Sequence, residues 1–219
     1  MSPPRNEPDV ARRLLDVAAR LLATEGAGAV SARRLAKEVG SSTMAVYTHF
    51  GGMDELLAQV RREGFRRFGA ALDASTRTDD PVADWMVLGW AYRRFAIDEP
   101  HLYRAMFGDV DRSFAPRSDE EAEEAIATFL VLLGRIERCS SSGRWQVRDL
   151  TTTAEACWGL AHGLAGMELT GYFAAKGRDP LAVHEENMRT TSAGHGDDAD
   201  AVEESLSRAR RRARRSGLL

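Results

Sequence analysis

The sequence contains little cysteine and no long apolar run. Cys139 and Cys157 are the only cysteines among 219 residues, which argues against a disulfide scaffold and fits a reducing cytoplasm. The most apolar stretch, residues 157–167, lies between Glu155 and Glu168 and is shorter than the ~20 residues that a membrane-spanning helix needs. The N-terminal MSPPRNEPDV also lacks the apolar segment of a signal peptide. We therefore expect a cytoplasmic protein with no membrane partner.

The usual patterns of catalysis and metal binding are missing as well. The cysteines and histidines form no Cys-x-x-Cys or His-Glu-x-x-His spacing, and no second histidine follows His184-Glu185-Glu186 at the required distance. No Gly-x-Ser-x-Gly, phosphate-loop or Ser-x-x-Lys motif occurs. Gly26 and Gly28 follow a helical pattern, whereas a dinucleotide site needs a preceding strand and a third glycine. We expect no catalytic residue, no metal and no cofactor.

An overall excess of positive charge is also absent. The formal net charge is −3, so a nucleic-acid surface would have to arise from local segregation of charge. Such segregation is visible, because cations are concentrated in the first forty residues and an acidic block lies at 119–124. The early cations are Arg5, Arg12, Arg13, Arg20, Arg33, Arg34 and Lys37. With 43% hydrophobic and 29% charged residues, the chain suits one small module joined to a larger helical domain.

Residues 31–57, SARRLAKEVGSSTMAVYTHFGGMDELL, have the pattern of two short helices separated by a tight turn. Ser31 can cap the first helix, whose apolar residues recur at intervals of three and four up to Gly40. Ser41 or Ser42 can cap the second, which has an apolar stripe of Val46 and Phe50. Its other face carries Thr43, Met44, Tyr47 and Thr48. This layout predicts a helix-turn-helix whose second helix enters a major groove.

The order LAKEVG, VYTHF and DELL resembles the DNA-binding segment of the TetR family of bacterial repressors. The resemblance implies that 42–49 is the recognition helix. Tyr47 and His49 would then contact phosphates, and Thr43, Met44, Ala45 and Thr48 would lie near base edges. Ser31, Arg33 and Ser42 complete the expected DNA-binding set. Two positions depart from the family pattern: Ser41 replaces an apolar turn residue, and Met53 replaces a lysine that would contact phosphate, although backbone N–H groups there can still bind one.

The rest of the chain predicts helices at 53–74, 81–98, 101–107, 119–138, 151–176 and 180–189. Trp158, His162 and Gly163 resemble the Trp-x-x-x-His-Gly signature of the WHG subgroup of TetR-like C-terminal domains. EPHLYRAMF at 99–107 resembles a segment of the regulatory domains in one TetR subgroup. The expected fold is all-α, with an N-terminal three-helix DNA-binding domain and a larger C-terminal helical domain for ligand binding and dimerisation.

Four segments are expected along the chain. They are a mobile arm at 1–8, the DNA-binding domain at 9–68, the regulatory and dimerisation domain at 69–190, and a flexible basic tail at 191–219. Residues 202–216, VEESLSRARRRARRS, place acidic before basic residues and fit a marginal helix. Its arginines can grip DNA or another polyanion, but a solvated tail is the favoured interpretation.

These patterns predict a homodimeric repressor that binds a palindromic double-stranded DNA operator and is released by a small, largely apolar effector. The dimer is expected to form through the helices at 151–176 and 180–189. The expected effector-binding residues are Trp85, Tyr92, Phe95, Phe107, Phe129, Leu133, Trp158 and His162. Most aromatic residues must nevertheless build the core, and a core or interface role is favoured for His162. The alternative is a helical small-molecule-binding or scaffold protein, against which the polar and aromatic set Thr43, Tyr47, Thr48 and His49 argues.

Overall fold

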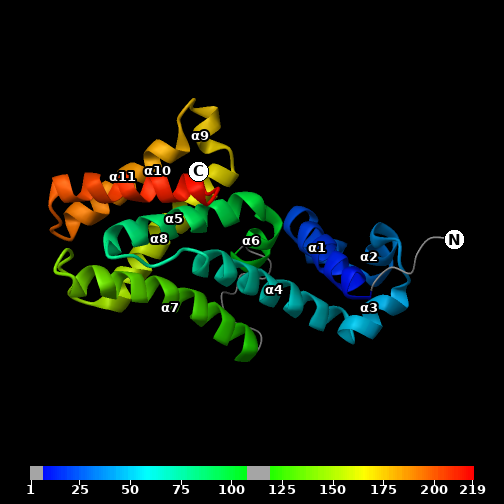
Figure 1. The fold of residues 1–219 in the computed structure, drawn as a ribbon. Coiled ribbons are helices and arrows are strands. Elements are labelled where there is room, and N and C mark those ends of the chain that lie inside the picture. Colours follow the sequence, from blue (N-terminus) through cyan, green and yellow to red (C-terminus); the bar gives the residue numbers. More distant parts are fainter. Residues whose placement is uncertain (1–6, 108–118) are drawn as a thin grey trace. The chain divides into compact units, whose positions relative to one another are not determined.

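The computed structural model describes residues 7–107 and 119–219, with side chains from residue 9 onward. These residues form eleven α-helices and one short 3-10 helix, with no strand in the described part (Figure 1). The all-α fold is confirmed. Residues 1–6 of the expected arm lie outside the described residues, whereas Glu7 already begins the first helix. No helix in 7–107 or 119–219 is long and apolar enough to cross a membrane.

The chain divides into two compact units. The first consists of residues up to Arg67 together with Glu99–Ala125, and the second of Phe68–Asp98 together with Ile126–Leu219. In the first unit, α1 (Glu7–Glu25) packs against α2 (Ala32–Val39), α3 (Thr43–Phe50) and α6 (Pro100–Phe107). The 3-10 helix η1 (Ala27–Ala29) connects α1 to α2. The core side chains that are fully buried include Leu14, Leu21, Leu35, Val46, Leu56 and Val60.

Helix α4 (Met53–Asp73) and helix α6 lie close together within the first unit, and a glycine makes that approach possible. A Cβ atom added at Gly64 would lie 2.6 Å from Cγ of Met106, a distance that side chains do not tolerate. Arg61 of α4 also forms a buried ion pair with Glu121 in the first turn of α7 (Asp119–Ser141), with Nε 2.7 Å from Oε1. Packing and a buried charge pair thus hold this part of α4.

Helix α5 (Pro81–Asp98) is the centre of the second unit, because 13 of its 18 residues are buried. It packs against α8 (Leu150–Leu169) and α11 (Ala199–Arg215), which in turn contacts α10 (Pro180–Gly194). Helices α5 and α11 lie side by side in Figure 1. All four tryptophans belong to this unit. Trp85 and Trp145 pack edge to face with ring centroids 4.8 Å apart, a favourable arrangement of aromatic quadrupoles.

The prediction of a single helix at 151–176 is wrong. Helix α8 ends at Leu169, and a separate short helix, α9, spans Tyr172–Ala175. Between them Gly171 adopts a left-handed conformation with φ of 76°, which glycine accepts without steric penalty and which stops a helix from continuing. Apolar residues on both sides of the break preserve the periodicity, so the sequence pattern does not reveal it.

The prediction of a flexible tail at 191–219 is also wrong. Helix α10 continues to Gly194, beyond the expected end at residue 189, and α11 follows after a four-residue connection. The Asp198 carboxylate caps α11 by accepting a hydrogen bond from the Ala201 N–H at 3.0 Å. Its buried face consists of Val202, Ser205, Leu206, Ala209 and Ala213. Alanine supplies much of this stripe and arginines surround it, which explains why composition alone suggested a solvated segment.

Both cysteines lie inside the second unit as free thiols. Cys139 is fully buried, and 7% of Cys157 is exposed. Burial disfavours the thiolate and raises the pKa of each to about 12. At neutral pH both side chains are therefore protonated thiols, which are poor nucleophiles.

Candidate nucleic-acid interface and effector site

Side-chain caps and two left-handed glycines define the helix-turn-helix. Ser31 Oγ accepts a hydrogen bond from the Arg34 N–H at 3.4 Å, and Ser42 Oγ accepts one from the Ala45 N–H at 3.3 Å. Gly40, with φ of 70°, ends α2, and Gly51, with φ of 72°, ends α3. The local sequence therefore sets the start and end of each helix, as predicted.

Helix α3 is anchored by a narrow apolar edge and exposes the rest of its surface. Val46 and Phe50 are buried, whereas Met44 is 66% exposed and Tyr47 is 51% exposed. Thr43 and Thr48 are also exposed, and Ala45 and His49 are half-buried. Large exposed apolar groups beside hydroxyls suit a surface that contacts another molecule. All the predicted residues of α3 except the half-buried pair thus point to solvent.

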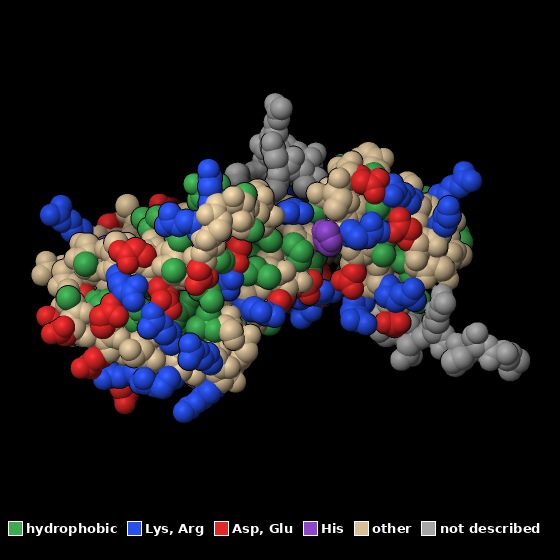
Figure 2. All heavy atoms as spheres, turned by 90° about the horizontal axis from the view of Figure 1, so that it is seen from above, with side chains coloured by type: hydrophobic (Ala, Val, Ile, Leu, Met, Phe, Trp, Pro, Cys, Tyr) green, Lys and Arg blue, Asp and Glu red, His purple; other side chains and the backbone are tan. Residues whose placement is uncertain are grey.

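The cations near this surface divide into paired and unpaired groups. Arg34 forms a two-point contact with Glu25, with N–O distances of 2.6 and 2.7 Å, and Arg13 donates to the Val39 carbonyl at 2.9 Å. Arg33 and Lys37 are exposed and have no ion pair within the described residues. Positive and negative side chains are interspersed over the surface shown in Figure 2. The cations without an acidic neighbour are therefore the ones available to bind a phosphate. The predicted DNA-binding set does not include Lys37, although Lys37 lies four residues after Arg33 on one face of α2.

The start of α4 carries two carboxylates and no lysine. Met53 is half-buried there, and the first turn carries Asp54 and Glu55. These carboxylates stabilise the helix start by interacting with its dipole, but they repel a phosphate that approaches the same N–H groups. A phosphate that approached this helix start would therefore meet two carboxylates and no lysine.

The predicted effector residues fall into both units. Phe107 belongs to the first, where it packs edge to face against Phe65 and Tyr103 at centroid distances of 5.7 and 5.1 Å. The other seven belong to the second unit. Trp85, Tyr92 and Phe95 are buried there, and Phe129 and Leu133 are partly buried against the core. Most of these aromatics build the core.

Three of the predicted residues meet on α5 and α8. The Tyr92 hydroxyl lies 3.0 Å from Nδ1 of His162, and the rings of Trp158 and His162 are 5.8 Å apart. Burial lowers the pKa of His162 below its ordinary value, so the imidazole is neutral at pH 7. A hydroxyl, a neutral imidazole and an indole offer hydrogen bonds and apolar surface without net charge.

A second polar group lies farther along the same helices and was missed by sequence reasoning. Arg93 donates from Nε to the Glu168 carboxylate at 2.7 Å, and His184 Nε2 of α10 is 3.7 Å from a Glu168 oxygen. Burial, together with Arg93, lowers the pKa of His184 to about 4. In the sequence, charged residues within otherwise apolar helices are the feature from which such a buried polar group could have been predicted.

Among the described residues, no group of three or more His, Cys, Asp or Glu side chains could hold a metal ion. No curated protein matches the chain in sequence. Among solved structures, a protein of unknown function from Rhodococcus sp. RHA1 is 24% identical, with a TM-score of 0.74 over 89% of this chain and 99% of that one. A bacterial regulatory protein of the tetR family from Rhodococcus RHA1 is also 24% identical, with a TM-score of 0.70 over 86% and 98%.

A third similar structure is RolR in complex with resorcinol, which is 18% identical and has a TM-score of 0.54 over 92% of this chain and 95% of that one. Two family models match the sequence itself. Residues 14–60 match the model of bacterial regulatory proteins of the tetR family, and residues 85–191 match the tetracyclin repressor-like C-terminal domain. One match contains the helix-turn-helix, the other contains the Tyr92–His162 group, and the chain therefore belongs to the TetR family of regulatory proteins.

Proposed function

We propose that this protein is a transcriptional repressor that binds a specific operator through α3. The exposed surface of α3 is the observation that carries the proposal, because a helix used only for packing has no need to expose Met44 and Tyr47 between two threonines. Tyr47 and His49 suit phosphate contacts, and Thr43, Met44, Ala45 and Thr48 suit base edges. We assign Ser31, Ser42 and Arg33 to the same interface and add Lys37 to it. Because an operator lies on bacterial DNA, we also propose that the protein is cytoplasmic.

Selection of bound sequences from random duplexes by the full chain tests this proposal. Replacing Tyr47 with Ala should weaken binding to all sequences by about tenfold if the phenol contacts phosphate. Replacing Thr48 with Ala should instead change the preferred bases. Tyr172→Ala provides a matched control, because Tyr172 is a similarly exposed tyrosine in the second unit, at 48%. If wild-type protein selects no sequence, the repressor proposal fails and the scaffold alternative is favoured.

We infer that two copies associate through α8 and α10. Gly159, Gly163 and Gly166 recur along α8, and a Cβ atom at any of them would meet nothing within 4 Å. Leu160 and Met167 on the same helix are 47% and 37% exposed. Glycine weakens a helix, so open glycines beside exposed apolar groups are best explained by close approach of another helix. For two copies related by a two-fold axis to read successive major grooves, their α3 helices must lie about 34–36 Å apart.

Replacing Gly163 with Arg tests this interface by measurement of mass in dilute solution. The open space around Gly163 means that the isolated chain accommodates the arginine, and we expect monomers. Gly134→Arg is the matched control, since Gly134 is also a helical glycine with nothing within 4 Å. A wild-type protein that is monomeric, or equal effects of the two variants, would contradict the interface.

We propose further that the second unit binds a small, largely apolar effector, with Tyr92 and His162 as polar groups and Trp158 beside them. The RolR complex shows that a similar fold accommodates resorcinol, which supports an effector of this kind. An effector that prefers a dimer with a different separation of α3 helices would release DNA by shifting the population. Trp158, His162 and Gly163 also support assignment to the WHG subgroup. We assign residues 9–68 to DNA binding, and 69–190 together with α11, which packs against α5, to regulation and dimerisation.

A screen of apolar compounds that measures both melting temperature and operator affinity tests this mechanism. Tyr92→Phe should weaken the response by removing the hydroxyl that lies against His162. Tyr103→Phe, a buried tyrosine of the first unit, is the control. A ligand that raises the melting temperature without changing operator affinity would contradict the inducer mechanism, because equal affinity for two states cannot shift their balance.

A further inference from the structure

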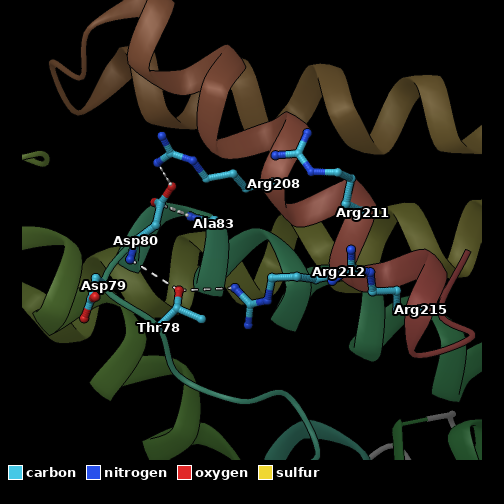
Figure 3. A pocket seen from close by; sticks show the side chains of 8 residues that line it. All are labelled: Thr78, Asp79, Asp80, Ala83, Arg208, Arg211, Arg212 and Arg215. Carbon is cyan, nitrogen blue, oxygen red and sulfur yellow. Dashed lines mark hydrogen bonds and ion pairs between the residues drawn. The ribbon is translucent and has the colours of Figure 1, made fainter.

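A groove in the second unit lies between α11 and the segment that leads into α5 (Figure 3). Its volume is about 430 Å³, within the range of small-molecule sites. The lining residues are Thr78, Asp79, Asp80, Ala83, Arg208, Arg211, Arg212 and Arg215. The four arginines recur at intervals of three and four residues, so they share one face of α11. This groove is separate from the Tyr92–His162 group and from α3.

Two of these arginines are fixed by carboxylates beneath the groove. Arg208 Nη1 donates to Asp80 Oδ2 at 2.9 Å, and Arg212 Nη1 donates to Asp84 Oδ1 at 2.6 Å. Asp80 is itself held by the Ser205 hydroxyl at 3.0 Å. Asp84 is fully buried, and Arg138 of α7 donates to its other oxygen at 2.6 Å. Both guanidinium groups are thus immobilised before any ligand arrives, which lowers the entropic cost of binding.

The ionisation of Asp84 follows from its bonds. Burial alone would raise the pKa of Asp84, but the Thr78 N–H, Arg138, Arg212 and the Thr78 hydroxyl together lower that pKa below its ordinary value. The carboxylate is therefore charged at neutral pH and continues to hold Arg212 and Arg138. An ionised carboxylate thus holds two arginines at the base of the groove.

The other two arginines of the groove have no such partner. Arg211 and Arg215 are exposed, and within the described residues neither forms an ion pair. Four arginines and two aspartates line the groove, which gives it a formal charge of +2 when all are ionised. Like charges one helical turn apart destabilise a helix. Interaction with the helix dipole favours cations near the end of α11, but it does not require them to face one hollow.

We propose that this groove binds a small molecule that carries a phosphate group or a pair of carboxylates. The planar guanidinium fork matches the oxygens of both groups and forms two-point contacts with them. Arg211 and Arg215 would neutralise the ligand, and the fixed Arg208 and Arg212 would position it. A duplex is a poorer occupant, because DNA-binding surfaces engage about 6–10 phosphates, whereas two of the cations that line this concave site have no ion pair with a described residue.

Calorimetric titration of the full chain with inorganic pyrophosphate and with citrate, at constant ionic strength, tests the proposal. Replacing both Arg211 and Arg215 with Gln should lower affinity by about tenfold or more. Both side chains are exposed, so the variant should fold, which tryptophan fluorescence can verify. The matched control replaces Arg178 and Arg214 with Gln. It removes the same charge from exposed positions of the second unit outside the groove and should change affinity by under about twofold.

The two ligands distinguish the sources of the oxyanion. Binding of pyrophosphate alone would assign the site to phosphate-bearing molecules, binding of citrate alone would assign it to carboxylates, and either result supports a groove specific for anions. Equal losses in the two double variants would show nonspecific attraction and overturn the proposal. It would also be overturned if neither ligand binds at millimolar concentration, or if the Arg211 and Arg215 variant loses affinity only for duplex DNA. None of these measurements depends on recognition of an operator.

Discussion

The two arginine-rich regions of the chain have similar composition but different surroundings. In the N-terminal region, Arg33 and Lys37 of α2 have no ion pair in the described part of the chain, and they lie beside a helix that exposes apolar side chains. In α11, Arg211 and Arg215 form no ion pair with any described residue and line a groove above buried carboxylates. The number of cations is therefore a poor guide to function. What matters is which cations the fold neutralises and whether the others lie on a protruding helix or in a hollow.

The two regions also differ in how many buried side chains anchor their helices. Helix α3 buries only Val46 and Phe50, whereas α11 buries five residues along its whole length. A helix with few anchors can present its surface to a partner, and a helix with many anchors contributes to the core. The predictions below test this difference, from the largest expected effect to the smallest.

Replacing Leu206 with Ala should destabilise the second unit by about 2–5 kcal/mol, because its side chain is completely buried and the vacated space cannot fully collapse. Denaturant unfolding followed by tryptophan fluorescence measures this effect, since every tryptophan lies in that unit. Met44→Ala on α3, followed by circular dichroism, is the contrasting variant and should cost under about 0.5 kcal/mol. An unchanged midpoint for Leu206→Ala would mean that α11 does not contribute to the core in solution.

The buried His184 should make the second unit sensitive to acid. Its pKa falls from 6.5 to about 4 on folding, so below pH 6.5 the unfolded chain binds a proton that the folded chain excludes. Stability is therefore lost as pH decreases toward 4, by about 2 kcal/mol between pH 7 and pH 5. His184→Gln should remove this part of the pH dependence. Parallel stability profiles for variant and wild type would contradict the assignment.

Removing the cap of α3 should have a smaller effect, confined to the first unit. Ser42→Ala deletes the bond to the Ala45 N–H and should cost about 1 kcal/mol. Ser42→Gly should cost only a few tenths of a kcal/mol, because glycine is tolerated at the N-cap. Circular dichroism should detect the loss while tryptophan fluorescence stays unchanged. A change in fluorescence would show that the two units do not respond separately.

The smallest expected effect compares an unpaired arginine with a paired one, and it depends on the proposed operator contact. Arg33→Gln should reduce the slope of log affinity against log salt by about 1, since one phosphate contact is lost. Arg34→Gln should change the slope less, because Arg34 is already bound to Glu25 and Glu38. Equal changes would show that ion pairing does not decide which arginines reach DNA.

Local chemistry made much of the fold predictable from sequence. Serine caps at Ser31 and Ser42, the turn at Gly40 and the start of α5 at residue 81 depend on neighbouring residues, and each lies where it was predicted. The break at Gly171 and the folding of α11 were not predictable in this way. Ser205 and Arg208 of α11 bind Asp80, which lies more than a hundred residues earlier in the chain. The break at Gly171 leaves the apolar periodicity intact on both sides. The set of exposed α3 residues was predictable, whereas the pairing of each cation was not.

The masking of Cys139 and Cys157 has a practical consequence for measuring this protein. Thiols with a pKa of about 12 and little or no exposure should react slowly with maleimides and nitroxide reagents. A single cysteine introduced at the exposed Thr48 can then be labelled in the otherwise natural chain. Spin labels at that position in two associated copies would report the separation of the α3 helices directly, with and without an effector, by dipolar spectroscopy.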